Sequence, residues 1–380
     1  MLQAETFHPS ALSDADAAAW TALAKTRPEF DSPLMTPAFA RAVGQVRPDA
    51  RVTVWRSGGR ARVFLAYHLR PGRLARPIGA PLSDYHALIA SEPIDTPAAL
   101  SAAGLAAYRF TGLIDPWKAF DGAVGAGQEA FVVRLDGSAE DYLEALRARS
   151  PKRFKNYRRL GHKLEREVGP LRLVPDDRDP AALGRLIEWK RAQLVRTGAT
   201  DFLAPGWTRA LVQALFDNPS PDFGGLMVSL YVGDRLAAGH FGVRAGPVFH
   251  PWIAAIDPEL AAASPGDVFM PKAIEAMPQL GLTTYDLGPG HEHYKAPFAL
   301  GRRLIGHGCA TAAGPSGASA RAAQTVWRML GADGEGMAGR LRRRIDTIAA
   351  LELSLPGRAR GLAGALAARA FGKGARTEAA

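Results

Sequence analysis

Cysteine and long apolar runs are both scarce in this sequence. Cys309 is the single cysteine among 380 residues, which excludes an internal disulfide framework and a cysteine-based zinc cluster. No apolar run approaches the roughly 18 residues that a membrane-spanning helix needs. The first 20 residues carry acidic side chains where a secretory signal would be basic and then apolar. We therefore expect a cytoplasmic protein in a reducing compartment, either free in solution or peripheral at the inner membrane.

The composition indicates a globular chain with an excess of positive charge. Hydrophobic residues make up 47% of the sequence, which is enough for proper cores, and the length favours two or three domains. The net charge is +10 and the pI is about 9.9. Such a balance favours an anionic partner: a phosphorylated donor, an acidic carrier protein, a membrane surface or nucleic acid.

Residues 283–298 hold the densest group of reactive side chains. The segment reads TTYDLGPGHEHYKAPF, a β-like run that stops at Gly288-Pro289-Gly290. Open α/β sheets keep their sites at the carboxyl ends of strands. The polar residues gathered here are Asp286, His291, Glu292, His293, Tyr294 and Lys295. An ordinary surface turn, in which Asp286 bonds its own backbone, is the alternative. Two histidines without a third ligand do not indicate a metal site, so none is expected.

The clearest predicted helix spans residues 151–168 and has one strongly basic face. Pro151 suits its first turn, and Gly169-Pro170 ends it. The apolar residues fall on one narrow face. The opposite face carries Lys152, Lys155, Arg158, Arg159, Lys163 and Arg166. This basic face is either simply solvated or binds an anion.

A second predicted helix, from the Asp179-Pro180 cap to Gly198, places a lysine within its apolar stripe. By helical periodicity Lys190 falls among the leucines, with Trp189 and Gln193 beside it. Either the stem of Lys190 packs while its ammonium reaches solvent, or the cation points into a pocket. In the second case Trp189 and Gln193 share that pocket.

Between residues 171 and 309 the predicted order is strand, helix, helix, three-stranded meander, helix, strand, short helical turn, strand. This order resembles the GNAT acyltransferase fold. Specific motifs make the chain similar to the CelD/BcsL family of GNAT-type acyltransferases from bacterial polysaccharide biosynthesis, which includes members that act on holdfast-type adhesins. The motifs are Trp189-Lys190 with Gln193, Ser264-Pro265-Gly266, Tyr285-Asp286-Leu287-Gly288, Tyr294-Lys295 and Leu82-Ser83-Asp84-Tyr85. The resemblance covers residues 30–310.

The resemblance implies an α/β chain of two tandem GNAT-like domains with mixed, mostly antiparallel sheets, as in the similar Fem-type aminoacyl ligases. The first domain is expected at residues 1–145 and the second at residues 146–310, with a basic connecting helix at 146–170. The implied activity is N-acyl transfer from acetyl-coenzyme A. The implied acceptor is an amino sugar in an exopolysaccharide or in its lipid-linked precursor.

The resemblance also implies roles for individual residues. Lys295 stands where relatives use a lysine to neutralise charge on the donor or the tetrahedral intermediate. Acyl transfer also needs a base for the acceptor ammonium and an acid for the leaving group. Asp286 is the candidate base, with Glu292 and His291 as alternatives. Tyr294 is a candidate acid. Expected substrate contacts are Asp84, Tyr85, Trp189, Lys190, Gln193 and His291, and expected cofactor contacts are Gly266, Gly288 and Gly290.

One departure from the GNAT pattern affects the donor. The usual glycine-rich loop, whose amides hold the coenzyme A pyrophosphate at a helix N-terminus, is replaced by Ser264-Pro265-Gly266-Asp267. Here the proline removes an N–H donor, and Asp267 adds a negative charge. Acetyl-coenzyme A is therefore a default expectation for the donor.

Two other functions compete with this hypothesis. One is a non-catalytic regulatory protein that binds a polyanion or a nucleotide, and the other is a Fem-like transferase with a donor other than acetyl-coenzyme A. Nucleic acid is not expected as a partner, because aromatic residues do not interleave with the charged face of the helix at 151–168.

Residues 311–380 lie outside the resemblance. Residues 310–323 predict a linker, and a basic, Ala-rich tail that is helical or disordered follows. Residues 358–376 have the basic amphipathic character of an interfacial helix, which suits a membrane surface. A second interpretation is a cyclic di-GMP site, since Arg343-Arg344-Ile345-Asp346 contains Arg-x-x-Asp and Arg340 precedes it.

Overall fold

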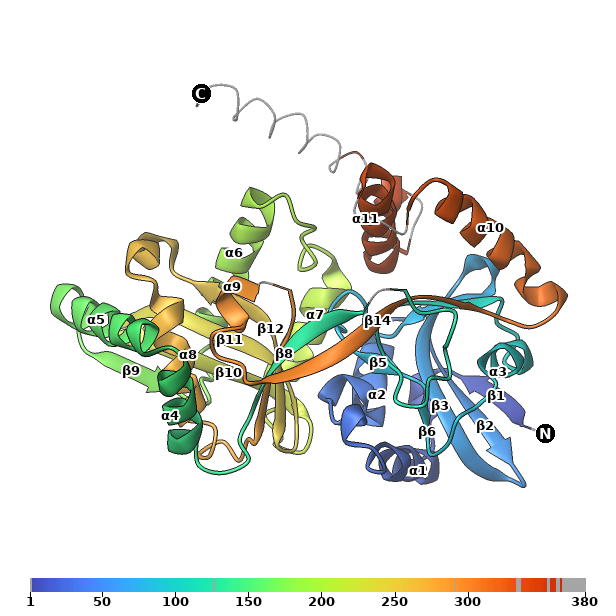
Figure 1. The fold of residues 1–380 in the computed structure, drawn as a ribbon, viewed down its shortest axis with the longest axis horizontal. Coiled ribbons are helices and arrows are strands. Elements are labelled where there is room, and N and C mark those ends of the chain that lie inside the picture. The colour runs from blue at the N-terminus through green and yellow to red at the C-terminus, as the bar shows by residue number, and fades with distance from the viewer. Residues whose placement is uncertain are drawn as a thin grey trace.

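The computed structural model describes residues 2–125, 127–290, 292–332, 336–353, 356–359 and 363. Within these residues the chain forms one mixed, mostly antiparallel sheet, flanked by helices (Figure 1). Its strand order is β1-β2-β3-β4-β7-β14-β8-β13-β12-β11-β10-β9, with the short strands β5 (His86–Ala87) and β6 (Ile89–Ala90) on β7 and β3. The predicted α/β class is therefore confirmed.

Apart from the short strands β5 and β6 and the 3-10 turns, each half of the chain repeats the same succession of eight elements. The first half contains β1 (Gln3–Phe7), α1 (Asp14–Ala24), α2 (Pro37–Val46), β2 (Ala50–Ser57), β3 (Arg60–Arg70), β4 (Leu74–Pro77), α3 (Thr96–Ala102) and β7 (Ala107–Ile114). The second contains β9 (Leu171–Val174), α6 (Pro180–Arg196), α7 (Gly206–Phe216), β10 (Gly224–Val232), β11 (Arg235–Ala245), β12 (Val248–Ile256), α8 (Pro265–Glu275) and β13 (Thr284–Pro289).

Strand pairing repeats along with element order. In both halves three antiparallel pairs lead to a parallel pair, which is β4–β7 in the first half and β12–β13 in the second; the short strand β5 also pairs with β7 in parallel. The predicted meander corresponds to β10, β11 and β12. This internal repeat is the tandem arrangement that the resemblance implied.

Two strands join the halves into one sheet. Strand β8 (Gln128–Arg134) pairs with β13, and β14 (Gly301–Thr311) pairs with β8 through residues 301–305 and with β7 through residues 306–311. Figure 1 shows β14 running from one half into the other. By pairing and packing, β8 and α4 (Ala139–Arg149) belong with the second half, although both precede the predicted boundary at 145/146. The division of the chain into two independently folding domains at 145/146 stays a prediction.

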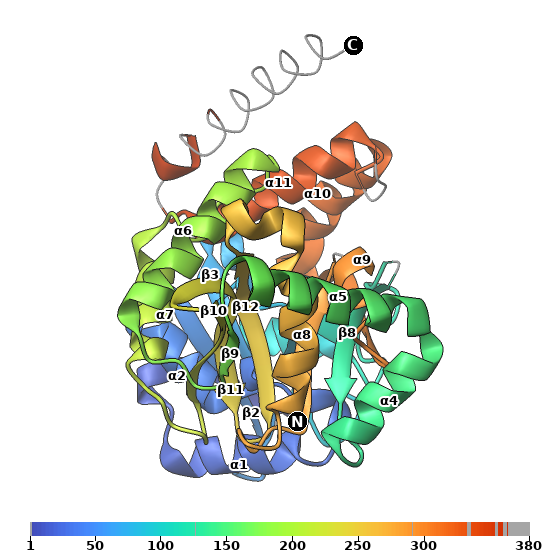
Figure 2. The same cartoon turned by 90° about the vertical axis from the view of Figure 1, so that its left-hand side faces the viewer.

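Helices cover both faces of the sheet in the second half. α6 and α7 pack on one face with Phe241 and Ile253, whereas α5 (Pro151–Glu167) and α8 pack on the other with Val228 and Phe249 (Figure 2). Side chains along β10, β11 and β12 are buried on both faces, which explains their continuous apolar character.

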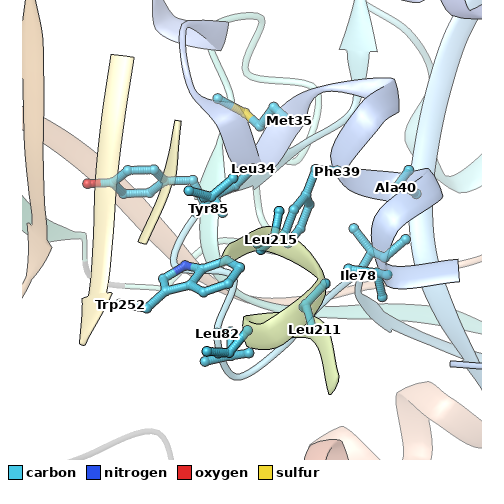
Figure 3. Packing of buried hydrophobic residues seen from close by; sticks show 14 of the residues in the cluster. Leu34, Met35, Phe39, Ala40, Ile78, Leu82, Tyr85, Leu211, Leu215 and Trp252 are labelled. Atoms are coloured by element: carbon cyan, nitrogen blue, oxygen red, sulfur yellow. The ribbon is translucent and has the colours of Figure 1, made fainter. Parts of the chain in front are cut away.

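A hydrophobic core is shared between the halves. Phe39 and Leu34 from the first half contact the region of Leu211, Leu215 and Trp252 from the second (Figure 3), and the ring centroids of Phe39 and Trp252 are 6.1 Å apart. Because this core is continuous, it fixes the loop at 81–85 against β12.

The segment predicted as a linker is partly helical. α10 (Ala318–Met329) begins inside the predicted linker, because the chain after β14 turns at once into a helix that carries Arg321 and Trp327. α11 (Met337–Leu351) follows, and Ile348 and Leu351 in it are buried. Most of the interfacial helix predicted at 358–376 lies outside the described residues. No described helix is long and apolar enough to cross a membrane.

α11 is anchored by arginines of the first half. The guanidinium groups of Arg76 and Arg109 both pair with Asp346, and Arg47 donates to the Ala350 carbonyl at 3.1 Å. A nucleotide that used the Arg-x-x-Asp motif through Asp346 would have to displace two ion pairs. Cyclic di-GMP binding, with Arg340, Arg343 and Arg344 as contacts, stays a prediction.

Candidate functional site

A cavity of about 520 Å³ lies where the two halves meet. Its walls come from α6, β11, β12, the start of α8, the short helix α9 (Glu292–Lys295) and the loop at 81–84 of the first half. Lining side chains include Asp84, Trp189, Lys190, Gln193, His240, Trp252, Asp267, Phe269, Tyr294 and Lys295. The structure thus brings together several predicted contacts that are over 200 residues apart in the chain.

The cavity exists because β12 and β13 diverge. They pair only at Val248–Thr284 and Phe249–Tyr285. Pro251 follows two residues later in β12, and it has no N–H to donate to a neighbouring strand. At the same place the register of β11 against β12 shifts between Phe241 and Gly242. The separated strand ends leave room for ligand between them.

Two lysines face one carboxylate across the cavity. Burial, and secondarily Lys295, lower the pKa of Lys190 to about 8, although Asp84 opposes the shift. The Lys190 ammonium donates to Gln193 Oε1 at 3.3 Å, so Lys190 points into the cavity rather than snorkelling to solvent. Burial also lowers the pKa of Lys295, against the effect of Asp84 and Asp286. Its Nζ donates to the Pro289 carbonyl at 2.7 Å.

Asp84 is held in place by a buried histidine. Asp84 Oδ2 lies 3.0 Å from His250 Nε2, and His250 Nδ1 lies 3.6 Å from Asp286 Oδ1. Burial alone would lower the pKa of His250, but the nearby carboxylates of Asp286 and Asp84, the latter hydrogen-bonded to it, outweigh burial and raise the pKa to about 9. At neutral pH His250 is therefore an imidazolium between two carboxylates.

Asp286 is not among the residues that line the cavity, and its role as the base stays a prediction. Its side chain is fully buried and accepts hydrogen bonds from the Tyr85 hydroxyl at 2.5 Å and from the Gly288 amide at 3.0 Å. Tyr85 is also fully buried, under the Arg303 guanidinium, so it does not line the cavity either. Both side chains are buried on the far side of Asp84 from the cavity, because the core shared by the two halves covers them.

The predicted cofactor glycines have different positions. Gly266 lines the cavity at the start of α8, beside Tyr294. Gly288 has φ +72°, and a Cβ there would come within 2.8 Å of Asp84 Oδ2. Gly288 is therefore required for close packing against Asp84. Gly290 has φ +74° and is not among the lining residues. His291 lies outside the described residues, and the side chains of Glu292 and His293 are not described.

Sequence reasoning missed His240. It lies in β11, buried, with Nδ1 2.8 Å from the Tyr285 hydroxyl and Nε2 3.1 Å from the Tyr294 hydroxyl. Burial, reinforced by Lys295 and Lys190, lowers its pKa to about 3. The only signal in the sequence was a polar residue in the middle of an apolar strand.

The start of α8 is acidic and lacks a side-chain cap. Ser264 adopts φ 47° as the N-cap residue without a side-chain hydrogen bond, and Pro265 follows. Burial raises the pKa of Asp267, against the effect of Arg153. The helix terminus faces the cavity, so its positive dipole end is available to an anionic donor. No group of three or more possible metal ligands occurs among the residues described.

Residues 151–296 match the family described as "Acetyltransferase (GNAT) domain". This segment is GNAT-like. It contains Lys190, His240, His250, Tyr294 and Lys295, so most of the cavity belongs to the GNAT-like segment, and Asp84 is supplied from the first half. No curated protein matches the chain.

The chain is similar to solved structures, of which FemX shows the same fold. FemX is 12% identical with a TM-score of 0.52, and the alignment covers 80% of this chain and 96% of that one. A tandem GNAT protein from the clavulanic acid biosynthesis pathway is 13% identical with a TM-score of 0.47, over 83% of this chain and 99% of that one. The family match supports an acyltransferase with a GNAT-like segment, and the likeness to FemX shows the fold.

Proposed function

We propose that this protein is an N-acyltransferase that transfers the acetyl group of acetyl-coenzyme A to the amine of an amino sugar in an exopolysaccharide or its lipid-linked precursor. One observation carries the proposal: two half-buried lysines of the GNAT-like segment and a carboxylate of the first half face the same cavity. The sugar and the CelD/BcsL assignment are supported by the motif resemblance. A Fem-like donor is the competing candidate.

The site residues suit the steps of acyl transfer. Asp84 binds the acceptor ammonium and takes its proton, because a carboxylate held by an imidazolium keeps its orientation. The free amine then attacks the thioester carbonyl carbon. Lys295 and Lys190 supply positive charge to the donor phosphates and to the developing oxyanion, which a partly desolvated site makes more effective.

The direct test is a screen of donors and acceptors with the full chain. Acetyl-coenzyme A and an aminoacyl-tRNA are each offered with glucosamine-containing acceptors, and products are identified by mass spectrometry. Acetylated amino sugar with release of free coenzyme A supports the proposal. Transfer only from aminoacyl-tRNA overturns the choice of donor, and binding of polyanions without any transfer overturns the enzyme assignment.

The pH profile should report on Lys190. With a pKa of about 8, its ammonium loses its charge in moderately alkaline solution, and kcat/KM should fall there. Lys190→Arg keeps the cation at every accessible pH, because the guanidinium pKa exceeds about 12. The falling limb near pH 8 should therefore disappear in this variant. Lys163→Arg on the exposed face of α5 is the matched control. A limb unchanged in Lys190→Arg would show that another group titrates.

A further inference from the structure

The cavity has two sides, which belong to opposite faces of the sheet. Trp252 and Leu82 are part of the core on the α6 face (Figure 3), and Trp189 and Phe202 pack against that core. Phe269 is part of the core on the α8 face. All five side chains line the cavity. The cavity therefore extends from an α6 side to an α8 side, through the gap between β12 and β13.

One face of α6 lines the α6 side of the cavity. Trp189, Gln193 and Arg196 are four and three residues apart in this helix, and side chains at such spacings share a face. All three line the cavity, so α6 lies along it. Arg196 is about 9 Å further along the helix axis than Lys190. Because Lys190 is half-buried and Arg196 is exposed, Arg196 lies at the rim of the cavity.

The loop after α6 forms a fixed aromatic wall on the same side. Asp201 pairs with Arg191 at 2.8 Å and accepts a hydrogen bond from the Leu203 amide at 3.0 Å. Leu203 is fully buried. Phe202 lies between these two anchored residues and lines the cavity. The wall is therefore formed before any ligand arrives, as in most small-molecule sites.

Arg196 carries a charge that no acidic side chain neutralises. Among the described residues it forms no ion pair, whereas Arg191 in the same helix pairs with Asp201. A guanidinium group matches the geometry of a phosphate and binds it through two hydrogen bonds. The phosphates of the donor have another place, because the positive end of α8 faces the cavity from the opposite side. Arg196 is thus free to bind a phosphate on the acceptor.

We propose that the α6 side of the cavity holds the acceptor, with Trp189 and Phe202 against its sugar ring and Arg196 bound to a phosphate on that sugar; this inference rests on the proposed function. Asp84 meets the acceptor amine at the inner end of the same side. The acceptor is then an amino sugar that still carries its phosphate, as in a lipid-linked precursor, and not the finished polymer.

The test compares two acceptors that differ in the phosphate. Glucosamine-1-phosphate and methyl glucosaminide are each offered to the full chain with acetyl-coenzyme A. Arg196→Gln should raise KM for glucosamine-1-phosphate about tenfold, because a charge-assisted hydrogen bond is lost, and should leave KM for methyl glucosaminide unchanged. Arg185→Gln is the matched control, since Arg185 is exposed on the same helix and is not among the lining residues. Phe202→Leu should raise KM for both acceptors alike.

A second comparison determines whether the phosphate that Arg196 binds belongs to the donor. Acetyl-dephospho-coenzyme A lacks the phosphate on the ribose. If Arg196→Gln raises KM for acetyl-coenzyme A but not for this analogue, Arg196 binds the donor and the proposal is wrong. If KM is unchanged for every substrate, Arg196 serves only the carboxyl end of the α6 dipole, and the proposal is wrong as well.

Binding without turnover separates this inference from the proposed function. Trp189 and Trp252 line the cavity, so tryptophan fluorescence reports a bound sugar when no donor is present. The wild type should bind glucosamine-1-phosphate about tenfold more tightly than methyl glucosaminide, and Arg196→Gln should abolish the difference. If this selectivity is found but no acetyl group is transferred, only the proposed function fails. Equal Kd values for the two sugars in the wild type overturn the phosphate site.

Discussion

Asp286→Asn is expected to lower the free energy of unfolding by about 3 kcal/mol, because a buried charge network loses its central anion. Asp286 lies 3.6 Å from His250 Nδ1 and 3.5 Å from Arg303 Nε, and all three side chains are less than one-tenth exposed. Without the carboxylate, Arg303 stays buried without this counter-charge, and the pKa of His250 falls because Asp84 alone remains to stabilise the imidazolium. Since His250 orients Asp84, kcat should fall at least tenfold while the protein remains folded. Chemical denaturation and steady-state kinetics measure the two effects.

The pH dependence of the free energy of unfolding tests whether the charge of His250 causes the loss of stability in Asp286→Asn. His250 has a folded pKa of about 9, above its ordinary value of about 6.5. The stability from its charged form is fully present below pH ~6.5 and is lost as pH rises towards 9. This slope should be clearly smaller in Asp286→Asn than in the wild type, because only Asp84 then raises the pKa of His250. Asp234→Asn, in the exposed turn between β10 and β11, is the control. Parallel pH profiles in wild type and Asp286→Asn would refute the network.

Removal of α11 is expected to destabilise the whole chain. Truncation after Leu330 exposes apolar surface beneath Ile348 and Leu351, each worth about 1.5–3 kcal/mol when fully buried. It also removes the carbonyl acceptors of two buried arginines: Arg47 donates to Ala350, and Arg70 donates to Ala349 and Glu352. We expect the free energy of unfolding to fall by about 3–5 kcal/mol.

A matched truncation separates α11 from the rest of the tail. Truncation after Ala359 keeps α11 and should unfold like the full chain. Asp346→Asn removes only the partner of Arg76 and Arg109, and should cost about 1–3 kcal/mol. If the chain cut after Leu330 unfolds at the same denaturant concentration as the full chain, α11 contributes nothing to the fold.

Local signals in the sequence determined much of the architecture. Proline in the first turn and glycine after the last turn bounded α5 and α6, and turn residues marked the meander of β10, β11 and β12. Such features act over a few residues, so they are readable without tertiary contacts. The position of Lys190 on the inward face of α6 also followed from periodicity alone.

Only the tertiary structure decided which polar groups meet. Asp84 reaches His250 across 166 positions of the chain, and Tyr85 reaches Asp286 across 201. No periodicity encodes such contacts, because they depend on the core shared by the two halves. Asp286 was the most conspicuous acid in the sequence, yet its side chain is buried and does not line the cavity. His240 belongs to no recognisable motif, yet it lines the cavity. The chemistry of each group follows from its burial and its neighbours, and both exist only once the chain has folded.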